Sequence, residues 1–379
     1  MSARWEPEEE RDAIAARLKG SSFADIADLL NLKYGTKRSV KAVKTKLTYS
    51  PEEASKKKET ELGSTIDYQE FVNELLTAYG NMEGILKSPQ IEDVFHGKLE
   101  ETAVLHLSDV HQGKVNWFTD LETNAGYETY NEKIMYAEMD RLVEAILSVN
   151  LLLAQSYTLK ELYIFATGDL LDNDLIVRGQ RFFVDVGVGL QTVKAQRLFE
   201  DFTLQMLRFF ERVHWRIIPG NHGRMTQQRE KAPYYNNFDW LLAQMLALAF
   251  RNEPRVTVES PESWFGLYKI YGWRYFLHHG DTVYSWMGIP YYGLQRQGKS
   301  RRTEVDMDIE LIGHFHQQME IPISSKSYTL VSGCWIEKDD WGWQKYGVFS
   351  KPEQRYFGVS PKRPRTWSFN LDLRPRKAV

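Results

Sequence analysis

The chain has 379 residues, a formal net charge of −3 and one cysteine. This length accommodates one large domain and a small appendage, and 42% hydrophobic with 26% charged residues is ordinary for a globular protein. We expect no membrane span and no signal peptide, because no stretch is long and apolar enough and the first residues lead into an acidic run. A lone cysteine excludes an intrachain disulfide, so we expect a cytoplasmic protein with Cys334 in its core.

The near-neutral total charge hides an uneven distribution. Basic residues cluster at Lys33–Lys46, Arg296–Arg302 and Lys362–Lys377. Local clusters of this kind follow a phosphate backbone in nucleic-acid-binding proteins, but solvated surface lysines and arginines give the same pattern.

Residues 1–50 are predicted to form a small helical module, because apolar side chains recur there at helical spacing. Ser21 or Ser22 suits the N-cap of a second helix, and Gly35 suits the turn that follows it. Ser39 suits the N-cap of a third helix over residues 40–47. This third helix and the residues before it are basic, with Lys37, Arg38, Lys41, Lys44 and Lys46.

Two segments separate this module from the rest of the chain. Residues 51–66 are polar and charged, and we interpret them as a linker. Residues 67–100 are predicted to be a helical connector, with Phe71, Leu75 and Leu76 on one face. That face either packs against the following domain or holds a homodimer, and the pattern does not decide between the two.

From residue 101 onward, short apolar runs rich in β-formers alternate with helical patterns. The helical patterns span Tyr136–Leu153 and Thr192–Phe210. This alternation predicts an α/β domain over residues 101–379, with a basic C-terminal tail. The runs are Val104–Leu107, Leu162–Phe165, Val213–Ile218, Tyr275–Leu277 and Ile309–Ile312.

Each of these runs ends in a polar motif. A single motif has an ordinary explanation, since a lone histidine is usually a surface or core residue and Gly-Asn is a common turn. Together they supply imidazoles and carboxylates, which suit Mn²⁺, Fe²⁺ or Zn²⁺ better than Mg²⁺ or Ca²⁺. A shared carboxylate can hold two ions roughly 3.5–4 Å apart, as in two-metal hydrolysis. The motifs are Asp109-Val110-His111, Gly168-Asp169-Leu170-Leu171-Asp172, Gly220-Asn221-His222, His278-His279-Gly280 and Gly313-His314-Phe315-His316.

As a set, the motifs resemble those of the calcineurin-like metallophosphoesterase superfamily. The resemblance implies an α/β fold of four layers, in which two facing β-sheets are flanked by helices. It also implies two divalent metal ions, with Mn²⁺ favoured over Fe²⁺ or Zn²⁺, and a metal-bridging hydroxide that attacks the phosphoester. By this resemblance, the ligands of the first metal are Asp109, His111 and His316, and those of the second metal are Asn221, His279 and His314. Asp169 is the implied catalytic residue that bridges the two ions. His222 is implied to protonate the leaving oxygen.

Three positions depart from the family pattern or leave a choice open. His278 and His279 compete for one ligand position, and we prefer His279 because the family's histidine precedes a glycine. Gly223 stands where many members have an acid that orients the catalytic histidine. Asp172 is predicted to support the ligands rather than to bind metal. Arg224 either grips a substrate phosphate or forms a surface salt bridge.

The surroundings of the motifs favour DNA as the substrate. The helical module resembles a Myb/SANT-like helix-turn-helix domain, whose basic third helix would contact backbone phosphates through Lys37, Arg38, Lys41, Lys44 and Lys46. The alternative is a protein-docking module with solvated lysines. The segment Trp286–Arg302 interleaves aromatic and basic residues, so Arg296 and Arg301 are predicted to contact substrate, unless the aromatics belong to the core.

We therefore predict a metal-dependent nuclease or phosphodiesterase that hydrolyses DNA, as in the break-repair exonuclease branch of the superfamily. One alternative is a phosphomonoesterase, either a protein phosphatase or a nucleotidase, whose helical module binds a protein partner. A second alternative is a catalytically inactive DNA-binding regulator. The metal motifs alone do not choose among these, because the surroundings of such a site determine its substrate.

Overall fold

The computed structural model describes residues 21–48 and 99–375, with gaps at 177, 228–231, 285–289, 340–341 and 345–346, and also residues 5, 8, 9, 12, 13 and 16. The chain divides into two compact units, Met1–Ser88 and Pro89–Val379. The predicted linker and almost all of the predicted connector lie outside the described residues. No described helix combines the length and the apolar composition that a membrane crossing requires.

The N-terminal unit contains helix α2 (Phe23–Tyr34) and helix α3 (Val40–Thr48). Ser22 is the N-cap of α2 and forms a capping box with Asp25, and Gly35 ends the helix in the left-handed region at φ 64°. Ala42 N donates to Ser39 Oγ at 3.2 Å at the start of α3. The predicted second and third helices are therefore confirmed. They enclose a small buried cluster of Ala13, Ile26, Ala27, Leu30 and Val43.

The structure corrects the DNA-binding role predicted for Arg38. Its Nε and Nη2 donate to the two carboxylate oxygens of Glu9 at 2.7 and 2.9 Å, and the two side chains are only 8% and 2% exposed. The guanidinium also lies 4.6 Å from the ring of Trp5. Arg38 is thus an internal support of the module. Lys37, Lys41 and Lys44 are exposed as predicted, and the side chain of Lys46 lies outside the described residues.

The larger unit contains two main β-sheets. The six-stranded sheet has the order β13 (Ser368–Asp372), β12 (Glu353–Val359), β1 (Leu99–Leu107), β4 (Tyr157–Ala166), β5 (Arg212–Ile217) and β6 (Val256–Glu259). The five-stranded sheet has the order β10 (Met319–Pro322), β11 (Tyr328–Val331), β9 (Ile309–Ile312), β8 (Trp273–His278) and β7 (Phe265–Ile270). A separate hairpin joins β2 (Asn116–Thr119) to β3 (Gly126–Tyr130). All five predicted strands are present.

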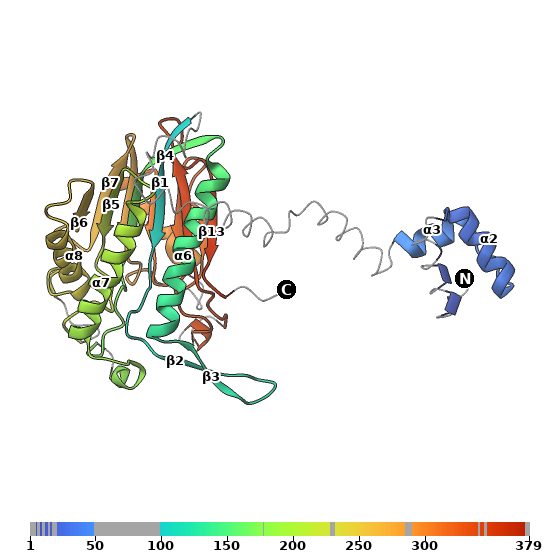
Figure 1. Cartoon of the computed structure of the whole chain (residues 1–379), viewed down its shortest axis with the longest axis horizontal. Coiled ribbons are helices and arrows are strands. Elements are labelled where there is room, and N and C mark those ends of the chain that lie inside the picture. Colours follow the sequence, from blue (N-terminus) through green and yellow to red (C-terminus); the bar gives the residue numbers. More distant parts are fainter. Residues whose placement is uncertain are drawn as a thin grey trace, which may run out of the picture. The chain divides into compact units, whose positions relative to one another are not determined.

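Helices cover the outer faces of the two sheets. Helices α6 (Glu132–Leu153), α7 (Val188–Met206) and α8 (Phe238–Ala249) pack on the six-stranded sheet, and α6 and α7 are seen in front of it in Figure 1. Helix α9 (Tyr291–Glu304) packs on the other sheet through Leu294. Strand β1 is buried on both faces, because Leu105 faces the helices and Val104 faces the second sheet. The predicted four-layer α/β fold is confirmed.

The strand directions bring the polar motifs together. Strands β1, β4 and β5 are parallel neighbours, and β8 and β9 are parallel neighbours in the facing sheet. The carboxyl ends of parallel strands meet at one edge of a sheet, so the loops after these five strands converge.

The Arg38–Glu9 pair gives a stability prediction. Replacing Arg38 with alanine breaks its buried salt bridge to Glu9, and removing one partner of a buried ion pair costs about 3–5 kcal/mol. A module this small seldom has more stability than that, so residues 21–48 should lose protection in hydrogen exchange of the full chain. The exposed neighbour Lys37→Ala is the control and should change the free energy of unfolding by less than about 0.5 kcal/mol. Equal protection in both variants would contradict the internal role of Arg38.

Candidate metal centre

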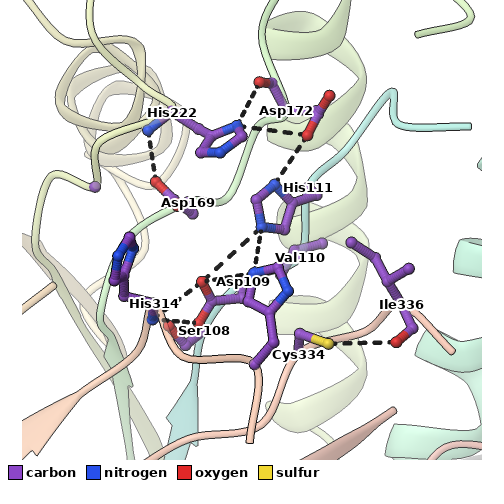
Figure 2. A network of polar contacts seen from close by, with 12 residues as sticks. Ser108, Asp109, Val110, His111, Asp169, Asp172, His222, His314, Cys334 and Ile336 are labelled. Carbon is purple, nitrogen blue, oxygen red and sulfur yellow. Dashed lines mark hydrogen bonds and ion pairs between the residues drawn. The ribbon is translucent and has the colours of Figure 1, made fainter. Parts of the chain in front are cut away.

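The loops after the strands bring candidate donor residues into three groups, two of which share His111. Within each group, one nitrogen or oxygen atom per residue lies within 4.8 Å of the others. Figure 2 shows part of this cluster, with His314 opposite Asp109 and the His111 and His222 rings turned towards Asp172. The groups are Asp109 with His111 and His316, Asp169 with His279 and His314, and His111 with Asp172 and His222.

The backbone of five predicted ligands is left-handed. The φ angles are 52° at Asp109, 51° at His111, 53° at Asp169, 71° at His314 and 55° at His316. This conformation costs roughly 1–3 kcal/mol for a residue with a side chain and persists only where surrounding contacts enforce it. Here the first two loops are linked, since the Asp109 and His111 amides donate to the carbonyls of Gly168 and Asp169 at 3.1 and 3.0 Å. The strained backbone turns these side chains inward, towards one another.

Glycines let these loops approach one another. A Cβ on Gly168, where φ is 90°, would lie 2.6 Å from the Cα of Gly220. A Cβ on Gly220 would overlap Asp169, and one on Gly313 would overlap Ser108 and Asp109. The glycine before each ligand in the Gly-Asp, Gly-Asn and Gly-His motifs is therefore required by close packing of backbones.

Three histidines are held through Nδ1, which leaves Nε2 for the centre. His111 Nδ1 lies 3.0 Å from Asp172 Oδ1, His316 Nδ1 lies 2.9 Å from Asp339 Oδ2, and His279 Nδ1 donates to Thr167 O at 2.7 Å. Such partners fix the tautomer and the ring orientation of metal-binding histidines. The Nε2 atoms of His111 and His316 lie 3.1 Å apart, near the carboxylate of Asp109.

The described residues fit divalent cations. Asp109 and Asp169 are buried carboxylates, and His279 Nε2 lies 2.9 Å from Asp169 Oδ2. Asn221 Oδ1 is buried without a hydrogen-bond partner, which is costly unless a cation or another donor satisfies it. A set of carboxylate, amide and imidazole donors in this arrangement matches the preferences of Mn²⁺, Fe²⁺ and Zn²⁺.

The choice between His278 and His279 is clear from their neighbours. His279 lies beside Asp169 and belongs to the second group of donors. His278 points elsewhere, with Nε2 3.0 Å from Glu310 Oε1. Only His279 is in reach of the centre.

Asp172 contacts His222, the residue that precedes Gly223. His222 Nδ1 lies 2.8 Å from the Asp172 carbonyl oxygen and 3.4 Å from its carboxylate. Both are acceptors, and the carbonyl oxygen is nearer to Nδ1 than the Gln180 Nε2 donor at 3.1 Å, so we place the hydrogen on Nδ1. Gln180, on the 3₁₀ helix η2 (Gln180–Phe183), donates from Nε2 to the same carbonyl at 2.6 Å. Gly223 has no room for a side chain, because a Cβ would overlap Asn237.

A family comparison agrees with this geometry. The sequence profile described as calcineurin-like phosphoesterase matches residues 102–328. The chain belongs to this family. Its members depend on two metal ions, and the donor groups described above are the candidates to hold them.

Other comparisons add little to this family assignment. No curated protein matches the phosphoesterase. Solved structures with a similar fold include Vps29 from Cryptosporidium parvum, at 14% identity and TM-score 0.31, covering 69% of this chain and 86% of that one. A metallophosphoesterase from Sphaerobacter thermophilus has 15% identity and TM-score 0.32, covering 72% and 89%. Likenesses this loose carry no argument about activity.

The electrostatics of the phosphoesterase centre lower the pKa of Asp169 and raise the pKa of His222. Burial by itself raises the pKa of Asp169, but His279 and His222 outweigh it and hold that pKa well below the usual range. Burial by itself lowers the pKa of His222, but the Asp169 and Asp172 carboxylates outweigh it and raise that pKa above its ordinary value.

Several supporting residues carry no recognisable sequence signal. Asp239 accepts hydrogen bonds from the backbone amides of Asp169, Leu170 and Gly220 at 3.0, 3.2 and 2.9 Å, so it fixes two motif loops at once. Burial, together with the charge of Asp169, raises the pKa of Asp239 to about 7. Asp339 holds His316 and pairs with Lys114 Nζ at 3.3 Å. The acidic and aromatic stretch around Asp339 is visible in the sequence, but its contact with a ligand is not.

The three arginines predicted to bind substrate have different positions. Arg224 Nη2 lies 2.6 Å from Asp281 Oδ2, two residues after His279, so it is beside the centre but paired. Arg301 Nη1 is 2.9 Å from the buried Glu310, and this pairing links α9 to strand β9. Arg296 is exposed on α9. Residues 286–289 of the aromatic segment lie outside the described residues.

Metal affinity should fall as pH is lowered. Burial by itself lowers the pKa of His279, but the Asp169 and Asp109 carboxylates outweigh it and raise the pKa to about 10. A cation must displace this proton, so between about pH 8 and pH 6 the association constant should fall by up to about tenfold per pH unit for each proton released. Calorimetry of Mn²⁺ binding in two buffers of different ionisation enthalpy measures the association constant and the number of protons released. A pH-independent affinity without proton release would contradict the assignment of His279.

Proposed function

We propose that this phosphoesterase is a metal-dependent nuclease or phosphodiesterase that hydrolyses the phosphodiester bonds of DNA. The observation that carries the proposal is the position of His222, whose ring is oriented by Asp172 and lies at 4.6 Å, edge to face, from the ring of the candidate ligand His111. A proton donor is thus held beside the donor groups for two cations. DNA is the substrate class that the basic helical module favours.

The first cation would be held by Asp109, His111 and His316, the second by Asn221, His279 and His314, and Asp169 would contact both. When bound, the two cations would activate a water molecule and neutralise charge on the phosphoryl oxygens. We propose Mn²⁺ as the metal, with Fe²⁺ or Zn²⁺ as alternatives. The mixed imidazole and carboxylate set suits all three.

The contribution of His222 is a proton for the leaving oxygen. A DNA strand departs as an alkoxide, which is a poor leaving group, so protonation in the transition state accelerates the reaction. The nearby carboxylates raise the pKa of His222, which favours the protonated ring that a proton donor needs. The Nδ1 atom is occupied by Asp172, so Nε2 is the atom that can donate.

Support for DNA comes from the N-terminal unit. Lys37, Lys41 and Lys44 are exposed at the start of α3 and along it. A basic helix after a turn is the element that helix-turn-helix proteins present to DNA. The module would localise the catalytic domain on its substrate.

An activity panel with Mn²⁺ tests the proposal. The substrates are single-stranded DNA, duplex DNA, a p-nitrophenyl phosphodiester and p-nitrophenyl phosphate. Hydrolysis of DNA and of the diester supports the proposal. Turnover of the monoester alone would make the protein a phosphomonoesterase, and DNA binding without any turnover would make it an inactive regulator.

Loss of the proton donor should depend on the leaving group. His222→Ala should reduce kcat/KM on DNA by on the order of 10²- to 10⁴-fold. The loss on the p-nitrophenyl diester should be much smaller, because p-nitrophenolate leaves without protonation. Asp169→Asn is the control. It should reduce the activity on DNA, the activity on the p-nitrophenyl diester and the amount of bound metal. Equal losses on both substrates in His222→Ala would remove the acid role from His222.

The exposed lysines should act on DNA alone. Replacing Lys37, Lys41 and Lys44 with glutamine should weaken DNA binding and reduce the slope of log K against log salt by about 0.9 for each duplex phosphate that is no longer neutralised. Turnover of the p-nitrophenyl diester is the internal control for an intact catalytic domain. An unchanged salt slope would assign the module to a protein partner.

A further inference from the structure

A short basic and aromatic segment, which we call the η2 platform, lies beside the catalytic candidates. It consists of Arg181, Phe182 and Phe183 on η2. Phe182 is 75% exposed and Phe183 is 59% exposed, and the Arg181 guanidinium lies 5.1 Å from the ring of Phe182. Single exposed apolar residues are common, but two adjacent aromatic rings next to a reaction centre mark a binding surface.

Contacts at both ends fix the platform next to the centre. On one side, Gln180 Nε2 donates to the carbonyl of Asp172 at 2.6 Å and lies 3.1 Å from His222 Nδ1. On the other side, Val115 N donates to Phe183 O at 2.8 Å, which ties the segment to the loop that follows His111. Consecutive Cα atoms are about 3.8 Å apart, so the Phe182 Cα lies within about 8 Å of the Gln180 Cα.

Two arginines lie on the platform and just before it. Between Leu175 and Phe183 the sequence has two charged residues, Arg178 and Arg181, and both are exposed; Asp174 and Asp185 flank this stretch. An arginine beside an aromatic ring can contact a phosphate while the ring face contacts a base. Aromatic faces with adjacent guanidinium groups are the combination that binds unpaired nucleotides.

We propose that the η2 platform stacks unpaired nucleobases next to the phosphodiester that is cleaved, so that the substrate is single-stranded DNA. This inference rests on the proposed nuclease function and deepens it. In a duplex the base faces are covered by neighbouring base pairs, whereas an unpaired base offers its face to Phe182 and Phe183. Stacking is insensitive to base identity, so the platform selects strand state and not sequence.

The first test compares a substrate that has bases with one that has none. The full chain with Mn²⁺ is assayed on a single-stranded oligonucleotide and on methyl p-nitrophenyl phosphate, and the ratio of the two kcat/KM values is measured. In F182A/F183A this ratio should fall by about 5- to 150-fold for each stacked base that is lost. F182Y/F183Y should keep the ratio, because tyrosine also stacks. Leu152→Ala, at a 62% exposed apolar residue on α6, is the matched control and should not change it.

The second test measures stacking without turnover. In a His222→Ala background, an oligonucleotide that contains 2-aminopurine should lose fluorescence on binding, and F182A/F183A should abolish the loss. Arg181→Gln should reduce the salt dependence of binding, whereas the phenylalanine variants should not.

The outcomes separate the two proposals. If the wild-type chain hydrolyses neither DNA nor the base-free diester, the proposed function fails, and the fluorescence titration still decides on the platform. If the wild-type chain cleaves single-stranded DNA and F182A/F183A changes neither the ratio nor the fluorescence, the platform is overturned and the nuclease stands. Cleavage of a blunt-ended duplex at the same rate as single strands also overturns the platform. So does the result that the phenylalanine variants change self-association and nothing else.

Discussion

The centre depends on negative charge that is buried at the edge of the six-stranded sheet. Asp109 and Asp169 are 0% and 1% exposed, and they follow neighbouring parallel strands, so their carboxylates face a shared volume. Isolating ionised carboxylates from water is costly unless opposite charge compensates them. Protonated His279 supplies part of that charge, and two divalent cations would supply it more fully while displacing the proton. The same buried carboxylates that would draw metal in also raise the pKa of His222.

A ring of further carboxylates makes this arrangement rigid. Asp172 orients His111 and His222, Asp339 orients His316, and Asp239 binds the amides of two motif loops. Lys114 balances the charge of Asp339. Five left-handed residues among the ligands persist only because this ring and the close-packed glycines determine their conformation.

The strands and the metal motifs could be predicted from the sequence because both are local patterns. Continuous apolar runs mark buried parallel strands, and a glycine with Asp, Asn or His after such a run marks the loop. Asp239 could not be predicted in this way, because it lies in the first turn of α8 and its partners are distant in sequence. For Arg38 and Arg301, charge alone predicts contacts with substrate. Charge pattern does not reveal an internal partner, and Glu9 and Glu310 neutralise these two arginines inside the fold.

Whether a side chain has a partner inside the fold also bears on substrate choice. The donor groups for the cations are internal and would serve any phosphoester, so selectivity must come from side chains at the edge of the centre that the fold itself does not use. Arg224 is paired with Asp281, and Arg301 with Glu310. Phe182 and Phe183, by contrast, expose their rings to solvent while Gln180, on the same helical turn, contacts the residue that orients His222. A base held on those rings would therefore be coupled through a single turn of backbone to the orientation of the proton donor.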